Sequence, residues 1–517
     1  MCGIAGTWGQ ANGTAVMAML DRLAHRGPDG MGLDRPCAEV VLGHRRLAIM
    51  DPTGGAQPLF SDDRRRALVA NGEIYNYPAL RRRLTADYEF ATNSDSEAAL
   101  HLFEEHGTRA CAQLDGMFAL AIADGDDLFL ARDPLGIKPL YTAVSRDGEQ
   151  LWFASELKAL TGLSGCEVSE FPPGCWFHSR HGLQRYWSLP IAEPEHWRAV
   201  DAVAALRAEL ERAVAKRLMS DVPVGAFLSG GLDSSLLCAL ARPMVDELHT
   251  FAVGLDGSPD LVAARRVAEH LDTVHHEYII TAQEMAEALP TILYHLESFD
   301  QDLVRSAIPC YFCSRLAAEQ VKVVLTGEGA DELFAGYTYH RAMPLDALHE
   351  ELHRSVLSLH NINLQRVDRL TMAHGLEARV PFLDTDLVDL ALRMPVDLKL
   401  RSTGDGELVE KYILRLVAEP LLPAEIVWRG KQQFDEGSGT VDALAAALAP
   451  RLDGFDHRGW RQQYPEARLR SPEEAWYHHL LCRVFDDPRA VLANVGRWSH
   501  RPNAAGEGSH PLASALS

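Results

Sequence analysis

Short apolar stretches separated by turns dominate the chain from residue 1 to about residue 190. Such stretches, bounded by Asp-Gly or Gly-Asp turns, predict β-strands at residues 40–42, 66–69, 118–122, 128–131 and 151–154. Apolar residues with a helical period predict helices between these strands, at residues 15–23, 78–84 and 96–106. The pattern therefore predicts an α+β layered domain over residues 1–190.

Beyond a polar, proline-bearing linker at residues 188–195, strands alternate with amphipathic helices. The first helix places Val203, Leu206, Leu210 and Val214 on one face. Strands are then predicted at residues 224–228, 249–255, 275–280 and 321–325, with helices at 234–241, 260–271, 283–295 and 308–319. Strands separated by helices predict a doubly wound parallel sheet that binds ligands at the carboxyl ends of its strands. The chain beyond residue 335 is predicted to be mostly helical, and residues 496–517 to be a disordered tail.

Composition and charge narrow the class of protein. A chain of 517 residues predicts two or three domains, and its net charge of −22 argues against nucleic acid or an anionic membrane as the main partner. The nine cysteines lack paired spacing apart from Cys310 and Cys313, which we interpret as core thiols rather than zinc ligands. No apolar run approaches the ~20 residues that span a bilayer. We therefore expect a cytoplasmic protein with reduced thiols.

The segment from Val224 to Ser235 reads Val-Gly-Ala-Phe-Leu-Ser-Gly-Gly-Leu-Asp-Ser-Ser, a buried strand, a glycine turn and a helix start. Backbone N–H groups at a helix N-terminus favour an anion, and glycines let the backbone approach it closely. Asp233 could hold a cation that accompanies phosphates. The segment therefore predicts a phosphate site, with an ordinary serine-capped turn as the alternative. Its candidate ligands are Ser229, Gly230, Gly231, Ser234 and Ser235.

Cys2 is a candidate nucleophile, because removal of Met1 would place a thiol and a free α-amine on one residue. A cysteine at position 2 means little by itself, but further motifs follow it in order. They are Met1-Cys-Gly-Ile-Ala-Gly6, His25-Arg-Gly-Pro-Asp-Gly30, Gly43-His-Arg-Arg-Leu47, Gln57-Pro58, Asn71-Gly-Glu-Ile-Tyr-Asn76, Ser94-Asp-Ser-Glu97 and Asp133-Pro-Leu-Gly-Ile-Lys-Pro-Leu-Tyr141. Residues 1–190 thereby resemble the N-terminal-nucleophile glutaminase domain of class II glutamine amidotransferases.

The resemblance implies roles for these residues. Cys2 would attack the side-chain amide of glutamine and release ammonia, while Asn71 and Gly72 would form the oxyanion hole. Arg46 would pair with the carboxylate of glutamine and Asp95 with its α-ammonium group. The implied glutamine-binding set is Arg46, Leu47, Asn71, Gly72, Glu73 and Asp95.

Motifs in the second half of the chain identify the acceptor domain. They are Leu228-Ser-Gly-Gly-Leu-Asp-Ser-Ser235, His249-Thr-Phe-Ala-Val-Gly-Leu-Asp-Gly-Ser-Pro-Asp260, Leu325-Thr-Gly-Glu-Gly-Ala-Asp-Glu-Leu-Phe-Ala-Gly-Tyr337, Glu377-Ala-Arg-Val-Pro-Phe-Leu-Asp384 and Trp428-Arg-Gly-Lys-Gln-Gln-Phe434. Together with the first half they resemble the glutamine-hydrolysing asparagine synthetase family. The resemblance implies an αββα sandwich over residues 1–190, then an ATP-pyrophosphatase synthetase domain over 200–495 with a doubly wound parallel sheet and a helical C-terminal part. It also implies a homodimer.

ATP and Mg²⁺ are the cofactors that the resemblance implies. Asp233 and Asp331 would hold Mg²⁺ through oxygen ligands, Lys431 would neutralise charge developing on the phosphate, and Glu328 would position the reacting groups or accept a proton. The alternatives are a helix cap for Glu328 and Asp331, and a solvated basic run for Lys431. The nucleotide would contact the glycine turn and Leu228, Val253, Thr326 and Gly327.

The acceptor carboxylate is the least constrained part of the resemblance. Arg305 would pair with it, but the sequence around Arg305 lacks the threonine-rich stretch and the small polar residue expected of aspartate-using members, since residues 302–304 and 307–308 read Asp-Leu-Val and Ala-Ile. We expect ATP-dependent amide formation with aspartate as the acceptor. The alternative is another carboxylate, as in natural-product biosynthesis. A catalytically silent glutamine- or ATP-binding regulator would have lost the nucleophile, the phosphate loop or the metal carboxylates, and this chain retains all three.

Overall fold

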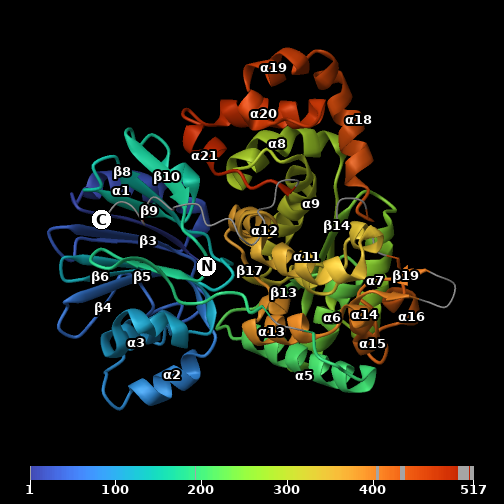
Figure 1. Cartoon of the computed structure of the whole chain (residues 1–517), viewed down its shortest axis with the longest axis horizontal. Helices are drawn as coiled ribbons and strands as arrows, with labels where there is room; N and C mark the ends of the chain where they lie inside the picture. Colours follow the sequence, from blue (N-terminus) through green and yellow to red (C-terminus); the bar gives the residue numbers. More distant parts are fainter. Residues whose placement is uncertain (1, 192–193, 403–406, 431–436, 499–511, 513–517) are drawn as a thin grey trace.

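The computed structural model describes residues 2–191, 194–402, 407–430, 437–498 and 512. Two domains lie side by side, one built around antiparallel sheets and the other around a parallel sheet and helices (Figure 1). Most of the predicted disordered tail lies outside the described residues. Arg497, near its start, pairs with Asp300 and Glu474, at 3.2 and 2.9 Å. Among the described helices, none has the length and apolar character needed to cross a bilayer.

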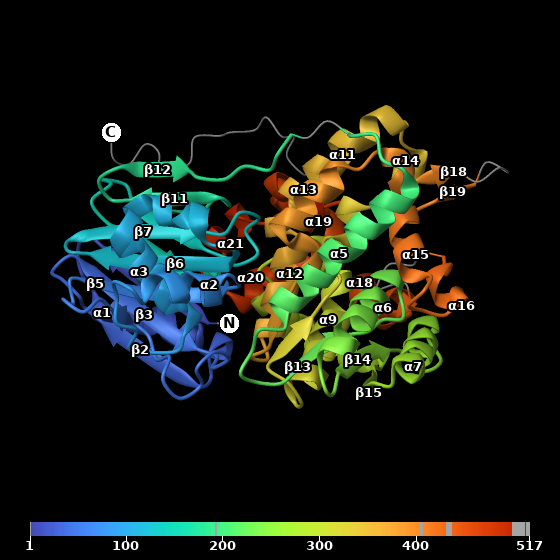
Figure 2. The same cartoon turned by 90° about the horizontal axis from the view of Figure 1, so that it is seen from below.

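The first domain stacks two six-stranded antiparallel sheets between helices, as Figure 2 shows. One sheet has the order β10-β8-β9-β1-β3-β2, with β1 Gly3–Trp8, β2 Gly30–Asp34, β3 Val40–Arg46, β8 Tyr141–Ser145, β9 Leu151–Ala154 and β10 Cys166–Glu170. The other has the order β12-β11-β7-β6-β5-β4, with β4 Leu59–Phe60, β5 Arg66–Ile74, β6 Gly116–Asp124, β7 Asp127–Arg132, β11 Cys175–His178 and β12 Gly182–Arg185. Helices α1 (Gly13–Arg22) and α4 (Leu157–Leu160) cover the first sheet, and α2 (Tyr77–Leu84) and α3 (Asp95–His106) cover the second.

Apolar layers between the sheets and beneath the helices hold this sandwich together. The layer between the sheets contains Ile4 and Leu42 from one sheet and Val69 and Ala121 from the other, all buried. A second layer lies beneath α2 and α3 and includes Phe103. Central strands are covered on both faces, which explains their nearly continuous apolar sequence. The predicted αββα sandwich is confirmed.

The second domain contains a five-stranded parallel sheet with the order β15-β14-β13-β16-β17. Its strands are β13 Val224–Phe227, β14 His249–Gly254, β15 Val274–Ile279, β16 Val323–Leu325 and β17 Glu377–Arg379. The helices that follow the linker are α5 Ala199–Arg217, α6 Leu232–Ala241, α7 Pro259–Leu271, α8 Ala282–Leu296, α9 Gln301–Ala318, α10 Ala330–Leu333, α11 Leu345–Leu357, α12 Asn363–Met372, α13 Thr385–Arg393, α14 Val396–Lys399, α15 Tyr412–Ala418, α16 Ala424–Val427, α18 Thr440–Asp453, α19 His457–Gln463, α20 Pro472–Val484 and α21 Arg489–Ala493. The chain leaves β13 toward β14 and returns on its other side as β16. The two loops therefore diverge at a topological switch point, where such sheets bind ligands.

Strand β17 and helix α9 of the second domain differ from the prediction. Strand β17 was missed, because two of its three residues, Glu377 and Arg379, are charged and leave no apolar pattern. Helix α9 begins seven residues before the predicted start at 308. Its first turns mix polar residues with Leu303 and Val304, and Pro309 interrupts the pattern, but Asp300 caps the helix by accepting from the N–H groups of Asp302 and Leu303.

A buried cluster of charges joins the two domains. Arg26 of the first domain contacts Glu156 at 2.6 Å and Asp368 of α12 at 2.8 Å. On the other side, Arg369 and Lys158 both contact Glu297 at 3.0 Å. Burial disfavours the charge on Glu156, but Lys158 and the other cations outweigh it and hold the pKa of Glu156 well below its usual value. Buried pairs of this kind fix the register of an interface.

Lys399 is a buried cation without such a partner, and its replacement by methionine is expected to stabilise the protein. Its side chain is fully buried at the end of α14, and Nζ has no hydrogen-bond partner within the described part of the chain. Burial lowers the pKa of Lys399 to about 7. On folding near neutral pH the side chain must therefore either lose its proton or be buried with its charge, and both cost free energy. Lys399→Met should raise the free energy of unfolding by about 2–4 kcal/mol at pH 7.

The sign of the pH dependence provides the check. The unfolded lysine holds its proton up to a higher pH than the folded one, so the wild-type protein gains stability as pH rises above 7, whereas the variant should not. Urea unfolding of the wild type and the variant at about pH 7 and pH 9.5 measures the stability difference and its pH dependence. Lys399→Arg, which keeps its charge, should be less stable than the wild type. Equal stability of Lys399→Met and the wild type would contradict the prediction.

Candidate active sites

Cys2 lies immediately before β1 and is held from three directions. Its backbone N–H donates to Oδ1 of Asn71 at 2.9 Å, and its carbonyl accepts from Nε of Arg26 at 2.9 Å. Its thiol points to the carbonyl of Leu47 at 3.9 Å. Burial raises the pKa of the Cys2 thiol, so the resting group is neutral and needs a base to become a nucleophile.

Asn71 and Gly72, adjacent on β5, provide a donor beside Cys2. Asn71 is fully buried, and among the described residues its Nδ2 has no hydrogen-bond partner. Gly72 has φ +149°, and a Cβ there would lie 1.9 Å from the carbonyl oxygen of Met117 on β6. Only glycine allows this approach of the two strands. A buried amide donor without a partner, fixed next to a thiol, is the arrangement that stabilises an oxyanion.

Arg46, at the end of β3, is oriented by the loop that follows it. Its guanidinium donates to the carbonyls of residues 50–52 at 2.5–3.3 Å. A Cβ on Gly55 would meet Nη2 of Arg46 at 2.8 Å and Cβ of Ser94 at 3.3 Å, so Arg46 and the residue before Asp95 face the same glycine. Arg46 therefore lies close to the start of α3, the helix whose first residue is Asp95.

Asp95 and Glu73 are buried carboxylates near the end of β5. Asp95 accepts from the N–H of Ile74 at 2.6 Å, and burial raises its pKa to about 6. Glu73 lies 3.5 Å from Arg379, a residue of the second domain. Burial and the negative charge of Glu377 raise the pKa of Glu73 well above its usual value. The first site therefore borders directly on strand β17.

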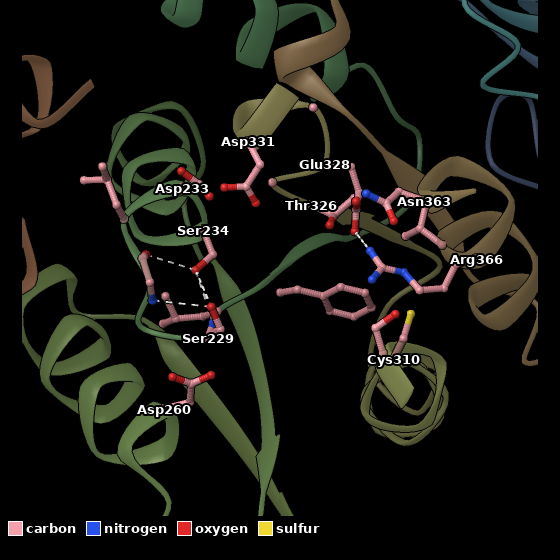
Figure 3. A pocket seen from close by; sticks show the side chains of 18 of the residues that line it. Ser229, Asp233, Ser234, Asp260, Cys310, Thr326, Glu328, Asp331, Asn363 and Arg366 are labelled. Atoms are coloured by element: carbon pink, nitrogen blue, oxygen red, sulfur yellow. Dashed lines mark hydrogen bonds and ion pairs between the residues drawn. The ribbon is translucent and has the colours of Figure 1, made fainter. Parts of the chain in front are cut away.

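A pocket with a volume of about 360 Å³ opens at the switch point of the parallel sheet (Figure 3). Its walls come from the loops after β13 and β16, from α9 and α12, and from residues 410–415. The volume suits a small organic ligand. Predicted site residues that line it are Leu228, Ser229, Gly231, Asp233, Ser234, Thr326, Gly327, Glu328 and Asp331.

The loop after β13 is closed by its own serines. The hydroxyl groups of Ser229 and Ser234 lie 3.1 Å apart, and the N–H of Gly231 donates to Ser229 at 3.3 Å. Gly230 has φ +70°, and a Cβ there would lie 2.5 Å from Cβ of Ala263 on α7. Gly230 is therefore required by the turn and by helix packing. The N-terminus of α6 faces the pocket from this loop.

Asp233 and Asp331 lie next to each other at one end of the pocket, as Figure 3 shows. Nζ of Lys411 lies 2.5 Å from Asp233 and 2.6 Å from Asp331. A single positive centre thus already contacts both carboxylates. Two hard oxygen donors around one cation position fit Mg²⁺.

The opposite end of the pocket carries Glu328, which pairs with Arg366 of α12 (Figure 3). Asn363, one turn before Arg366, also lines the pocket and donates to Glu332 at 3.1 Å. Ser306 contributes a hydroxyl from α9. This end therefore offers both a carboxylate and a guanidinium to a ligand.

Several predicted residues lie away from the pocket. Arg305 forms a bidentate pair with Glu473 of α20, at 2.6 and 2.9 Å, and it does not line the pocket. Val253 and Ser235 are buried behind the pocket wall. Gly230 also does not line it, and Lys431 lies outside the described residues.

The sequence analysis missed Lys411, Arg366 and Asn363. Lys411 had one recognisable signal: it caps the N-terminus of α15, where the helix dipole disfavours a cation. A positive charge in such a position indicates an anionic partner elsewhere. Arg366 and Asn363 lie on an amphipathic helix and carry no comparable local signal.

The geometry defines a class of protein, a glutamine amidotransferase domain joined to a nucleotide-binding α/β domain. A family model described as "Glutamine amidotransferase domain" matches residues 1–187, and one described as "Asparagine synthase" matches residues 205–347 and 343–500. The chain is 42% identical to "Asparagine synthetase [glutamine-hydrolyzing] 2" of Arabidopsis thaliana, over 96% of this chain and 89% of the relative. It is 39% identical to "Asparagine synthetase [glutamine-hydrolyzing]" of Asparagus officinalis (94% and 86%) and 40% identical to a "Probable asparagine synthetase [glutamine-hydrolyzing]" of Schizosaccharomyces pombe (92% and 91%). The chain belongs to the glutamine-hydrolysing asparagine synthetase family.

Proposed function

We propose that the protein converts aspartate to asparagine, with glutamine as the nitrogen donor and ATP and Mg²⁺ as cofactors. The observation that carries the proposal is the presence of two constellations in one chain: Cys2 with the Asn71 donor, and a switch-point pocket with Asp233, Asp331 and Glu328. Curated relatives that cover nearly the whole chain carry this activity in their names. All nine cysteines are free thiols, which supports a cytoplasmic location.

The first half-reaction uses Cys2. After loss of Met1, its α-amine accepts the thiol proton, and the thiolate attacks the amide carbon of glutamine. Asn71 Nδ2 and the N–H of Gly72 stabilise the oxyanion. Collapse of the tetrahedral adduct expels ammonia, which takes up the proton held by the α-amine. Water then hydrolyses the thioester to glutamate and restores the thiol.

The second half-reaction takes place in the pocket of the parallel sheet. A carboxylate oxygen of the acceptor attacks the α-phosphorus of ATP, and pyrophosphate leaves. Bound Mg²⁺, which Asp233 and Asp331 would hold, supplies the positive charge that pyrophosphate departure requires. Ammonia attacks the acyl carbon, a proton passes to Glu328, and AMP leaves. Arg366 beside Glu328 is positioned to orient the acceptor carboxylate.

A different carboxylic acid as the acceptor is the second candidate function. It is favoured by one observation: Arg305 is occupied by Glu473, while Asp302, Leu303 and Ser306 form the α9 wall of the pocket. An acidic and an apolar side chain in this wall are a poor match for the small zwitterion aspartate.

Pyrophosphate release distinguishes the two functions. The purified protein is incubated with ATP, Mg²⁺ and glutamine, with aspartate or without an added acceptor, and products are identified by mass spectrometry. Aspartate-dependent pyrophosphate together with asparagine supports the proposal. Glutamate production without aspartate-dependent pyrophosphate refutes aspartate and supports the second candidate. Sedimentation velocity of the same sample tests the homodimer that family membership suggests.

Glutamine use is expected to depend on the ionisation of Asp95. Because burial raises its pKa to about 6, Asp95 is negatively charged at neutral pH and loses that charge as pH falls through about 6. The value of kcat/KM for glutamine should therefore fall about tenfold per pH unit below that point. Glutamate release without ATP measures this value between about pH 5 and pH 8.

Asp95→Asn is the matched control, since it keeps the shape of the side chain without the charge. It should have low kcat/KM throughout and should lose the pH dependence that Asp95 causes. A wild-type profile that stays flat below pH 6 would show that Asp95 does not hold the ammonium group of glutamine.

A further inference from the structure

Lys411 is held in an unusual backbone position between the two carboxylates of the pocket. It has φ +54° immediately before α15, and its N–H donates to the carbonyl of Phe334 at 3.2 Å. Its side chain is buried, and Nζ contacts Asp233 and Asp331 at 2.5 and 2.6 Å. A non-glycine residue at positive φ is strained, and it persists only where surrounding contacts require it.

Gly336 leaves the space that the Lys411 side chain occupies. A Cβ at position 336 would lie 2.2 Å from Cε of Lys411 and 1.9 Å from Oδ1 of Asp331. Any larger residue would displace the ammonium or the carboxylate. The chain is therefore shaped around the contact between Lys411 and Asp331.

The other acidic groups of the pocket are already engaged. Each contacts a donor other than Lys411: Asp260 with Arg429, Asp302 with Arg470, Glu328 with Arg366, Glu332 with Tyr337, and Glu410 with Arg415. An ammonium displaced from Asp233 and Asp331 would thus need a new anion. The phosphates of an incoming nucleotide are such an anion, and they are the natural partner of a compact point charge.

A divalent cation bound by Asp233 and Asp331 would occupy the space that Nζ now fills. Mg²⁺ approaches its oxygen ligands to about 2.0–2.1 Å, closer than an ammonium group does. Two cations cannot share this position, because their repulsion is strong in a buried site. The metal and Lys411 are therefore mutually exclusive at these carboxylates.

We infer that Lys411 is the resident counter-ion of this metal site and makes metal binding depend on nucleotide. Free Mg²⁺ is excluded by the ammonium, whereas the Mg·ATP complex supplies both the metal for the carboxylates and the phosphates that receive the displaced Lys411. The inference rests on the proposed function for the identity of the nucleotide. It adds that Lys411 is a positioning residue that keeps the two carboxylates assembled before the substrate enters.

Manganese binding tests the inference without turnover. Electron paramagnetic resonance of free Mn²⁺ is measured for the full chain, with and without α,β-methylene-ATP, in the absence of any acceptor. For the wild type we expect at least tenfold tighter Mn²⁺ binding with the nucleotide than without it. Without nucleotide, Lys411→Met should bind Mn²⁺ at least tenfold more tightly than the wild type does. The nucleotide should then increase the Mn²⁺ affinity of the variant by a smaller factor than it does for the wild type.

Lys399→Met is the matched control, since it removes a different buried lysine and should leave Mn²⁺ binding unchanged. Asp233→Asn should weaken binding in every state, which assigns the signal to this site. Wild-type protein that binds Mn²⁺ equally well with and without nucleotide would overturn the inference, as would Lys411→Met binding like the wild type. The manganese measurement contains no acceptor. If aspartate-dependent pyrophosphate release fails while the manganese results are as expected, the proposed acceptor is wrong and the inference about Lys411 still holds.

Discussion

Cys2→Ala is expected to lower glutamine-dependent amide formation by about 10³-fold or more, while ammonia-dependent formation stays within about threefold of the wild type. The Cys2 thiol is the group proposed to attack the amide of glutamine, so its loss removes the ammonia supply. The second pocket lies in another domain and keeps its own residues. Product formation with glutamine and with ammonium chloride, measured in parallel, gives both values.

Cys37→Ala is the matched control, because Cys37 is a half-buried thiol outside both sites and should leave both activities unchanged. Retention of glutamine-dependent activity in Cys2→Ala would exclude Cys2 as the nucleophile. Loss of the ammonia-dependent reaction as well would mean that the mutation disturbs the second domain.

Arg379→Met is expected to destabilise the protein by about 3–5 kcal/mol. The guanidinium is fully buried and contacts Glu377 at 2.6 Å and Glu73 of the first domain at 3.5 Å. It also donates to the carbonyls of Arg217 and Met219, at 2.7 and 2.5 Å. Burial opposes the charge on Glu377, but neighbouring cations including Arg379 outweigh it and hold the pKa of Glu377 at about 2. Methionine would leave two buried carboxylates without this cation.

Urea unfolding measures the loss, and two further variants test its cause. Arg379→Lys keeps the charge but loses the fixed geometry, so its stability should lie between those of the wild type and Arg379→Met. The double variant Arg379→Met/Glu377→Gln removes one uncompensated charge and should recover part of the stability. Arg393→Met removes two solvent-accessible ion pairs, with Glu195 and Asp389, and should cost less than about 1 kcal/mol. If Arg379→Met is as stable as the wild type, Arg379 does not stabilise the fold by compensating buried carboxylates.

Arg379 also contacts one residue of each candidate site. Its side chain reaches Glu73 beside the oxyanion donors, and its carbonyl accepts from the N–H of Thr326 in the loop after β16, at 3.0 Å. We therefore expect Arg379→Met to raise KM for both glutamine and ATP. An effect on one substrate alone would show that β17 serves only that domain.

Much of the fold follows from local patterns in the sequence. The apolar runs of the first domain predict its strands, because central strands of a sandwich are buried on both faces. The alternation of strands and helices after residue 200 predicts the parallel sheet and places Ser229 and Asp233 at its switch point. Cys2, Asn71 and Asp95 were identified by the resemblance, and the structure gathers them around β5.

The tertiary structure decided which charged groups meet. Arg305 was predicted to face the acceptor, yet it pairs with Glu473 from a helix far along the chain, and Arg366 takes the position beside Glu328. Lys411 reaches Asp233 across 178 residues of sequence. Apolar periodicity is set by neighbours along the chain and can be read from it. The partner of a buried charge is set by how distant elements pack, and this is why strand β17 and the contacts of Lys411 with Asp233 and Asp331 appeared only in the folded protein.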